Sequence, residues 1–155
     1  MSPKRLQSPS IPDLKGTTLA TPQDAELILK LYELRTEATM REARRFVAAF
    51  NPATIDELLA LQRDGRSQNN AYWRQATSYW EMAASLVNRG ALDDELFSDN
   101  CGEALFYYAK FSPLHDAYKQ ATGQPFMRNV AALIEKSPAV AARYAPVAKR
   151  FQPKS

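Results

Sequence analysis

Residues 79–99 read YWEMAASLVNRGALDDELFSD, and this stretch decides the fold. Apolar and small side chains recur every three or four residues up to Val87, as they do on one face of a helix. Arg89 and Gly90 then suit a helix end, and Asp93 suits the N-cap of the next helix. The stretch therefore predicts two helices joined by a short turn, which pack as an antiparallel hairpin.

Similar capping signals divide the rest of the chain into helices. Upstream, Thr21-Pro22 begins a helix that meets no breaker before Phe50, where Asn51-Pro52 ends it. No run alternates with period two, so we expect no strand. The sequence predicts an all-α fold, a compact array of about five to seven helices around the central antiparallel hairpin. Further helix starts are predicted at Thr54, at Ser67 or Asn69-Asn70, at Ser112-Pro113, after Gln124-Pro125, and at Ser137-Pro138, with the last helix ending before Pro146 or fraying after it.

The first predicted helix carries two apolar stripes that are out of phase with each other. We therefore expect its two halves to pack on different surfaces, or the helix to bend between them. Such an arrangement would let the first half project from the core and meet another subunit. The first stripe comprises Leu27, Leu31, Leu34 and Ala38, and the second comprises Met40, Ala43, Val47 and Phe50.

Length and composition suit a single globular domain with tails. The chain has 155 residues, of which 45% are hydrophobic and 24% are charged. Residues 1–20 are rich in Pro, Ser and Lys without periodicity, which predicts a disordered basic tail. We expect a helical domain over residues 21–147 and a basic C-terminal tail over residues 148–155. The net charge of +3 permits an anionic partner but does not require one.

The sequence offers no signal for a membrane or for export. No apolar run approaches the roughly 20 residues that span a bilayer. The N-terminal residues also lack the apolar stretch of a signal peptide. We therefore expect a cytoplasmic protein without a membrane span.

The residues that carry metal or nucleophile chemistry are scarce. Cys101 and His115 are the single cysteine and the single histidine, so a zinc site with three or four such ligands is excluded. Cys101 falls in an apolar stripe, which favours core packing over a nucleophilic role. Glu95, Asp99 and Glu103 recur at i, i+4 and i+8, and we expect them on a solvated helix face. Phosphate loops, hydrolase elbows and metalloprotease motifs do not occur, so we expect no metal and no cofactor.

Arginines concentrate on the first predicted helix, among interleaved acidic residues. We expect these arginines to pair along the helix in a mixed-charge face, or to bridge to acids on a neighbouring helix, since a guanidinium can clamp a carboxylate with two hydrogen bonds. Glu81 lies beside the apolar stripe of its helix and, when partly buried, needs such a partner. We expect that partner to be an arginine of the first helix. The candidate interaction or structural polar cluster comprises Arg35, Arg41, Glu42, Arg44, Arg45, Glu81, Arg89 and Asp93.

Two stretches resemble a known family. Residues 31–47, LYELRTEATMREARRFV, and residues 79–99 are similar to a bacterial family of small all-helical domains of unknown function, over about residues 27–111. The resemblance implies a helical fold and no known activity, and it transfers no catalytic residue. The second family phrase, Leu-Val-x-Arg-Gly-x-Leu-Asp-x-x-Leu, is present as Leu86, Val87, Arg89, Gly90, Leu92, Asp93 and Leu96.

The sequence leaves three functions open. The first is a non-enzymatic helical interaction or regulatory module, with a protein partner or a second copy of the chain. The second is a nucleic-acid-associated protein that uses the basic tail and the first-helix arginines, with salt-sensitive binding. The third is an enzyme with an acidic site built from Glu81, Asp99, Glu103 or His115.

Overall fold

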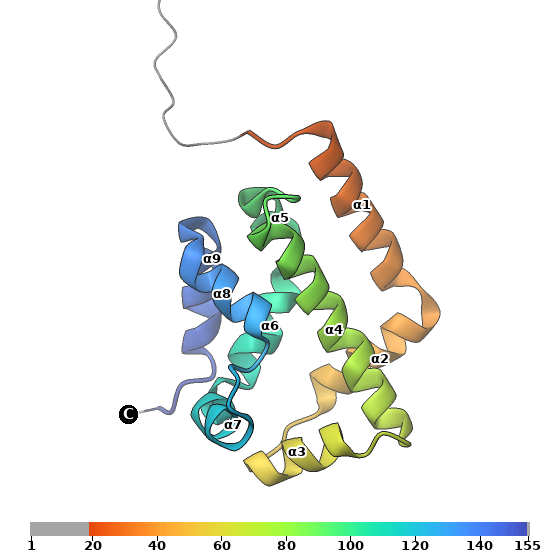
Figure 1. The fold of residues 1–155 in the computed structure, drawn as a ribbon, viewed down its shortest axis with the longest axis vertical. Coiled ribbons are helices and arrows are strands. Elements are labelled where there is room, and N and C mark those ends of the chain that lie inside the picture. The colour runs from red at the N-terminus through yellow and green to blue at the C-terminus, as the bar shows by residue number, and fades with distance from the viewer. Residues whose placement is uncertain (1–18, 155) are drawn as a thin grey trace, which may run out of the picture.

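The computed structural model describes residues 19–154 (Figure 1). Within that range every regular element is a helix, and no strand occurs. The all-α fold is therefore confirmed for these residues. The predicted N-terminal tail, residues 1–20, falls almost entirely outside the described range. The elements are α1 (Pro22–Thr36), α2 (Ala38–Ala49), α3 (Ile55–Arg63), α4 (Gln68–Asn88), α5 (Asp94–Asn100), α6 (Gly102–Lys110), the short 3-10 helix η1 (Ser112–Leu114), α7 (His115–Thr122), α8 (Arg128–Lys136) and α9 (Pro138–Lys149).

Local capping chemistry begins most of these helices where the sequence predicts. In five of them the N-cap side chain accepts a hydrogen bond from the backbone N–H three residues further on. At two exits a glycine takes the left-handed conformation that it adopts without strain. The N-caps are Thr21, Thr54, Ser67, Asp93 and Ser137, and the glycines are Gly90 and Gly123, with φ of 75° and 73°.

Residues 19–154 form nine α-helices, more than expected, because two predicted helices are each broken. The first predicted helix breaks at Glu37, whose φ of −61° and ψ of 144° are extended. The predicted change of phase is thus realised as a bend. The second break falls at Cys101, between α5 and α6. In contrast, α9 continues through Pro146 to Lys149 instead of ending before that proline.

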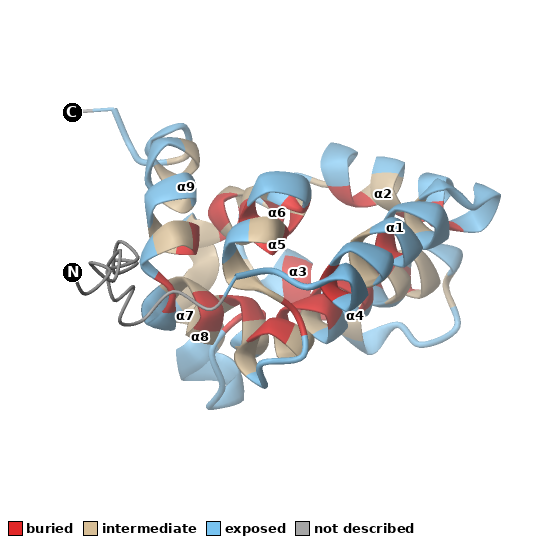
Figure 2. Ribbon diagram, turned by 90° about the horizontal axis from the view of Figure 1, so that it is seen from above, coloured by how far each residue is buried: buried red, intermediate tan, exposed pale blue. Residues whose placement is uncertain are grey.

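The core is centred on α4. Helices α2 and α8 pack along it, and α3 lies beside it. Trp73 and Trp80 of α4 are buried, with Phe97 of α5 and Tyr107 of α6 in the same core. Figure 2 shows buried residues gathered between α4, α6 and α8, whereas α1 is mostly exposed. The core therefore forms around α4, and α1 lies at its edge.

The hairpin through Gly90 takes a different form from the one expected. The chain does turn at Gly90, but α5 then packs mainly against α1 and α9. Helix α6 in turn packs against α8 and α9. The break at Cys101 divides the second arm of the hairpin into these two short helices. As a result, α4 finds its main neighbours in α2 and α8.

The C-terminal end of the described chain is attached to the domain. The last helix reaches Lys149, and the ring of Phe151 lies 5.7 Å from the ring of Phe106. Val140, near the start of α9, is fully buried. Between residues 19 and 154, the helices lack the combination of length and apolar character that crossing a membrane requires.

Candidate interaction site

The start of α1 is fastened to the start of α5. Thr21 and Asp24 form a reciprocal capping box at the first turn of α1. The second carboxylate oxygen of Asp24, Oδ1, accepts a hydrogen bond from the backbone N–H of Asp93 at 3.0 Å. Hydrogen bonds from the Thr21 backbone and side chain and from Asp93 outweigh partial burial and lower the pKa of Asp24. One carboxylate thus ties α1 to the turn that follows Gly90.

The end of α1 is attached through its backbone and through Arg35. The Tyr79 hydroxyl donates a hydrogen bond to the carbonyl of Leu31, which is one of the buried residues of α1. The Arg35 guanidinium donates to the carbonyl of Asn100, with both terminal nitrogens within 3.3 Å. It also lies 5.7 Å from the centre of the Trp80 ring. Arg35 thereby stabilises the C-terminal end of α5.

Arg44 of α2 forms the most complete polar contact of this region, with Glu103 of α6. Its Nε and Nη2 lie 2.8 Å from the two carboxylate oxygens, and its Nη1 donates to the carbonyl of Arg35 at 3.2 Å. Trp80 Nε1 donates to the same carboxylate at 3.1 Å. Arg44, Glu103 and Trp80 therefore join α2, α6 and α4 at the point where α1 ends.

The pKa values of Arg44, Glu103 and Tyr79 follow from the surroundings of these side chains. Burial alone raises the pKa of Glu103, but the hydrogen bonds and charge of Arg44, with the Trp80 bond, outweigh it and lower the pKa. The hydrogen bonds that Arg44 donates to Glu103 raise the pKa of Arg44. Burial raises the pKa of Tyr79 to about 12. The cluster is thus a stable ion pair beside a neutral tyrosine near neutral pH.

The structure brings together only part of the predicted polar cluster. Arg35 and Arg44 meet at the junction of α1 and α2, whereas Asp93 contacts Asp24 at the opposite, N-terminal end of α1. The remaining surface members of the cluster lie apart. Arg41, Glu42 and Arg45 are exposed on the outside of α2, where Arg45 pairs with Glu42 at 2.5 Å, and Arg89 is exposed at the C-cap of α4.

The prediction that Glu81 pairs with an arginine of the first helix is wrong. Its carboxylate accepts hydrogen bonds from the backbone N–H groups of Asn129 and Val130, at 2.9 and 3.0 Å. Glu81 therefore caps α8, whose N-cap residue Met127 provides no side-chain cap. The carboxylate that meets Arg44 is Glu103, which the sequence placed on a solvated face.

The predicted position of Glu103 on a solvated face is wrong because the helix breaks before it. A continuous helix would align Glu103 with Glu95 and Asp99 on one face. The backbone leaves the helix at Cys101, with φ of −122° and ψ of 38°, so α6 starts with a new phase. Asp99 keeps the expected exposure and pairs with Arg143 of α9. The apolar pattern alone carried no signal for this break.

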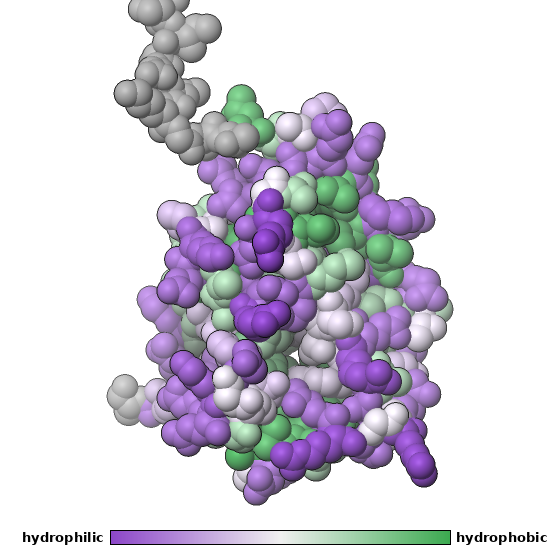
Figure 3. Space-filling view, viewed as in Figure 1, coloured by the Kyte–Doolittle hydropathy of each residue, from purple (hydrophilic) through white to green (hydrophobic). Residues whose placement is uncertain are grey.

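Besides the polar groups that attach it to the core, α1 carries large apolar side chains that are exposed to solvent. Leu29, Tyr32 and Leu34 have 68%, 57% and 43% of their surface exposed. Leu19, just before α1, and Met82 of α4 are exposed as well. Figure 3 shows hydrophobic side chains gathered over the part of the surface where α1 and the end of α4 lie. We call Leu29, Tyr32 and Leu34 the exposed apolar residues of α1.

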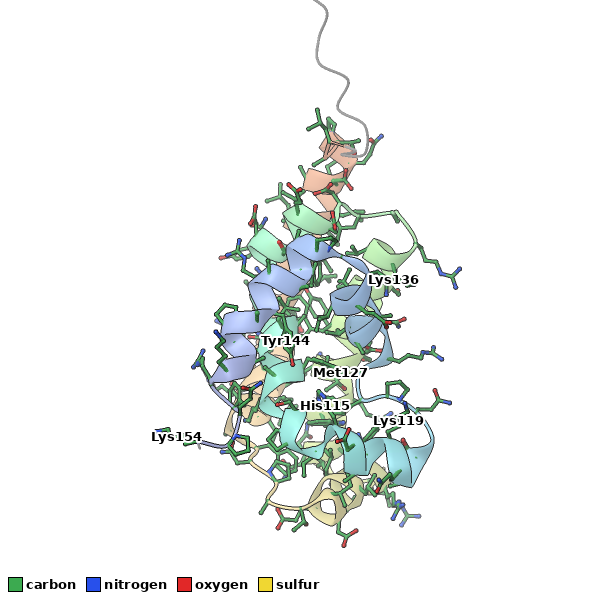
Figure 4. All side chains as sticks on the ribbon, turned by 90° about the vertical axis from the view of Figure 1, so that its left-hand side faces the viewer. His115, Lys119, Met127, Lys136, Tyr144 and Lys154 are labelled. Atoms are coloured by element: carbon green, nitrogen blue, oxygen red, sulfur yellow. The ribbon has the colours of Figure 1, made fainter. Side chains whose placement is uncertain are left out.

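His115 and Cys101 lie in different surroundings. The His115 ring packs 4.3 Å from Tyr108 and 5.4 Å from Phe126, and Figure 4 shows it on the side of the molecule near Met127 and Tyr144. Burial lowers the pKa of His115. Burial also raises the pKa of Cys101 to about 11, which keeps it a thiol. Cys101 is therefore a buried thiol of the core, and His115 is a half-buried ring packed against aromatic side chains.

The acidic residues near the start of α5 act as structural caps. A cavity of about 750 Å³ opens there between α1, α5 and α9. Of its carboxylates, Asp24 and Asp93 cap their own helices, and Asp94 accepts from the Ser137 hydroxyl at 2.5 Å. Across residues 19–154, His, Cys, Asp and Glu nowhere gather in a group of three that could hold a metal ion.

Comparison with known protein families finds a match over most of the chain. The family model described as a domain of unknown function (DUF4760) matches residues 20–137. These residues run from the N-cap of α1 to the N-cap of α9, so they include every polar contact of the α1–α2 junction. The curated proteins and the solved structures contain no match to the chain. The chain belongs to the DUF4760 family of domains of unknown function.

Proposed function

We propose that this chain is a helical protein-interaction module that self-associates through α1. The observation that carries the proposal is the exposure of Leu29 and Tyr32 on one outward face of a helix at the edge of the core. Burying one such side chain contributes about 1.5–3 kcal/mol. A surface that exposes several of them on one helix marks a site of association.

The distribution of side chains around α1 supports this proposal. Leu31 faces the core, and Leu27 and Ile28 are partly buried beside it. A charged strip runs along a second side of α1. It includes Lys30 and Glu33, whose side chains form an ion pair at 3.5 Å. The remaining side is apolar or small, at the spacing i, i+4, i+7 and i+11 that pairs helices with each other. This outer stripe comprises Ala25, Leu29, Tyr32 and Thr36.

Fewer observations support the other two functions. Arg35 and Arg44 are directed to partners inside the domain, which leaves Arg41 and Arg45 of the first-helix arginines for a nucleic acid. The acids proposed for an enzyme cap helices or form ion pairs, as Glu81 and Glu103 do. A cytoplasmic location stays a prediction.

The test is the concentration dependence of the oligomeric state. We expect sedimentation equilibrium to show dimers of the full chain at high protein concentration. Replacing Leu29 and Tyr32 with serine removes apolar surface from the outer stripe and should yield a monomer with unchanged helix content. Replacing Lys30 and Glu33 with serine is the matched control, because these residues lie on the charged strip, and this variant should still associate. A wild-type chain that stays monomeric at every concentration contradicts the proposal.

A further inference from the structure

We infer that α1 is an exchangeable arm, whose break at Glu37 closes into one continuous α1–α2 helix while α1 packs on the core of a second copy. The inference rests on the proposed self-association through α1, but it forms the dimer through the inner contacts of α1 and not through the outer stripe. We call the surface that receives α1 the α1 seat. It consists of Tyr79, Trp80, Asp93 and Asn100.

The break at Glu37 depends on a single residue. Its φ of −61° already suits an α-helix, and only its ψ of 144° departs from the helical value near −42°. The residues around it, Thr36 and Ala38, include neither glycine nor proline. Rotation about one backbone bond is thus the main change needed to join α1 to α2, as in other single-residue hinges.

The residues around Glu37 favour one continuous helix from α1 into α2. Glu37 provides no side-chain cap for α2, so the first backbone N–H groups of α2 gain no partner from their N-cap. In a continuous helix these N–H groups would bond to the carbonyls of the last turn of α1. Tertiary contacts of α1 with its seat therefore hold the break open against the preference of the local sequence.

The polar contacts between α1 and its seat are few and can be transferred as a set, together with the apolar packing of Leu31. The Asp24 carboxylate accepts from Asp93, the Leu31 carbonyl accepts from Tyr79, and Arg35 donates to Asn100. Each joins a group of α1 to a group of the seat. The α1 of a second copy presents the same groups and so regains all of these contacts, as in domain swapping. The intact and exchanged forms then differ mainly at the hinge.

Two substitutions at Glu37 shift this balance in opposite directions. Glu37→Pro suits the broken form, because φ of −61° lies in the range of proline and the Glu37 N–H makes no backbone hydrogen bond. In a joined helix that proline would occupy an interior position, and we expect dimerisation to weaken on the order of 100-fold. Glu37→Ala favours the helix and should strengthen dimerisation.

A distance measurement reports the joined helix directly. Spin labels on cysteines at Glu26 and Arg45, both exposed, are placed in a chain that carries Cys101→Ala. Dilution with unlabelled chains restricts the signal to pairs within one chain. In a continuous helix these positions lie about 28 Å apart along the axis, and a bend at Glu37 shortens the distance. We expect the longer distance to grow with protein concentration, more in Glu37→Ala and less in Glu37→Pro.

The outcomes separate the two proposals. Dimers that disappear in the Leu29 and Tyr32 variant but form equally well in Glu37→Pro support pairing through the outer stripe and overturn the exchange. Dimers of Glu37→Ala that keep the short distance overturn the exchange as well, even when Glu37→Pro folds poorly. A chain that stays monomeric in every variant contradicts both. Weak association of Glu37→Pro, together with a long distance in Glu37→Ala, supports the exchangeable arm.

Discussion

Arg44 and Glu103 face each other through two parallel hydrogen bonds, from Nε to Oε1 and from Nη2 to Oε2, each 2.8 Å long. The pair joins α2 to α6 across 59 residues of sequence. Trp80 of α4 donates to the same carboxylate. Because both side chains are partly shielded from water, with about 30% and 25% of their surface exposed, the pair is stronger than a surface ion pair.

Removing the Glu103 carboxylate should destabilise the fold. Glu103→Ala leaves the Arg44 guanidinium and the Trp80 N–H without their acceptor, and we expect the free energy of unfolding to fall by about 2–4 kcal/mol. Glu42→Ala is the control, because Glu42 pairs with Arg45 on the surface, where such pairs contribute about 0–1 kcal/mol. Urea unfolding followed by circular dichroism measures both. Equal losses in the two variants would contradict the structural role of Glu103.

Acid should destabilise the folded chain through Glu103 and Asp24, whose pKa values are both lowered. A lowered folded pKa means that the unfolded chain binds more protons than the folded chain in the acid range. The stabilisation is therefore full above the unfolded values, near 4, and is lost as the pH falls through the folded pKa values. Urea unfolding at a series of pH values tests this. The slope below pH 4 should be smaller in Glu103→Gln, and parallel curves would contradict the assignment.

His115 should produce a separate pH dependence at a higher pH. Burial between Tyr108 and Phe126 lowers its pKa, against smaller opposing effects of the Tyr108 backbone and Asp116. The unfolded chain therefore takes up this proton first, and stability falls as the pH drops below about 6.5. His115→Phe keeps an aromatic ring in the cluster and should abolish the dependence that begins as the pH falls below about 6.5. A variant that keeps the wild-type slope would show that another group titrates there.

Helix α9 should be required for stability although the family match ends at residue 137. It packs against α5, α6 and α8, and Val140 is fully buried. We expect Val140→Ala to lower the free energy of unfolding by about 1–3 kcal/mol, because it leaves a cavity in the core. Ala142→Ser is the exposed control on the same helix and should change it by less than about 0.5 kcal/mol. Thermal unfolding of the two variants measures both changes in stability, and equal losses would contradict the role of α9.

The fold could be predicted from the sequence where local chemistry determines it. Caps such as Thr54 and Asp93 satisfy backbone groups within one turn, so their effect is visible in a few adjacent letters. The glycine at position 90 likewise ends α4 through its own backbone freedom. These signals placed the starts of α1, α3, α4, α5 and α9 correctly because neighbours in sequence are also neighbours in space.

The out-of-phase apolar stripes indicated a bend in the first predicted helix, but its position at Glu37, the break at Cys101 and the ion pairs could not be predicted in this way. Glu37 is no helix breaker, and α1 leaves the axis of α2 because Asp24, Leu31 and Arg35 bind distant groups. The break at Cys101 then rotates Glu103 toward Arg44, which no periodic pattern of a continuous helix can indicate. Contacts between residues far apart in sequence therefore decided which acid meets which arginine.

The cap of α8 comes from Glu81, 48 residues earlier in the chain than Asn129. Helix α8 is short, and isolated helices of its length are marginal in water. The cap of its first turn therefore exists only while α4 is helical and in place, which couples the stability of α8 to that of α4. In native-state hydrogen exchange the amides of Asn129 and Val130 should accordingly open together with α4, as one cooperative unit.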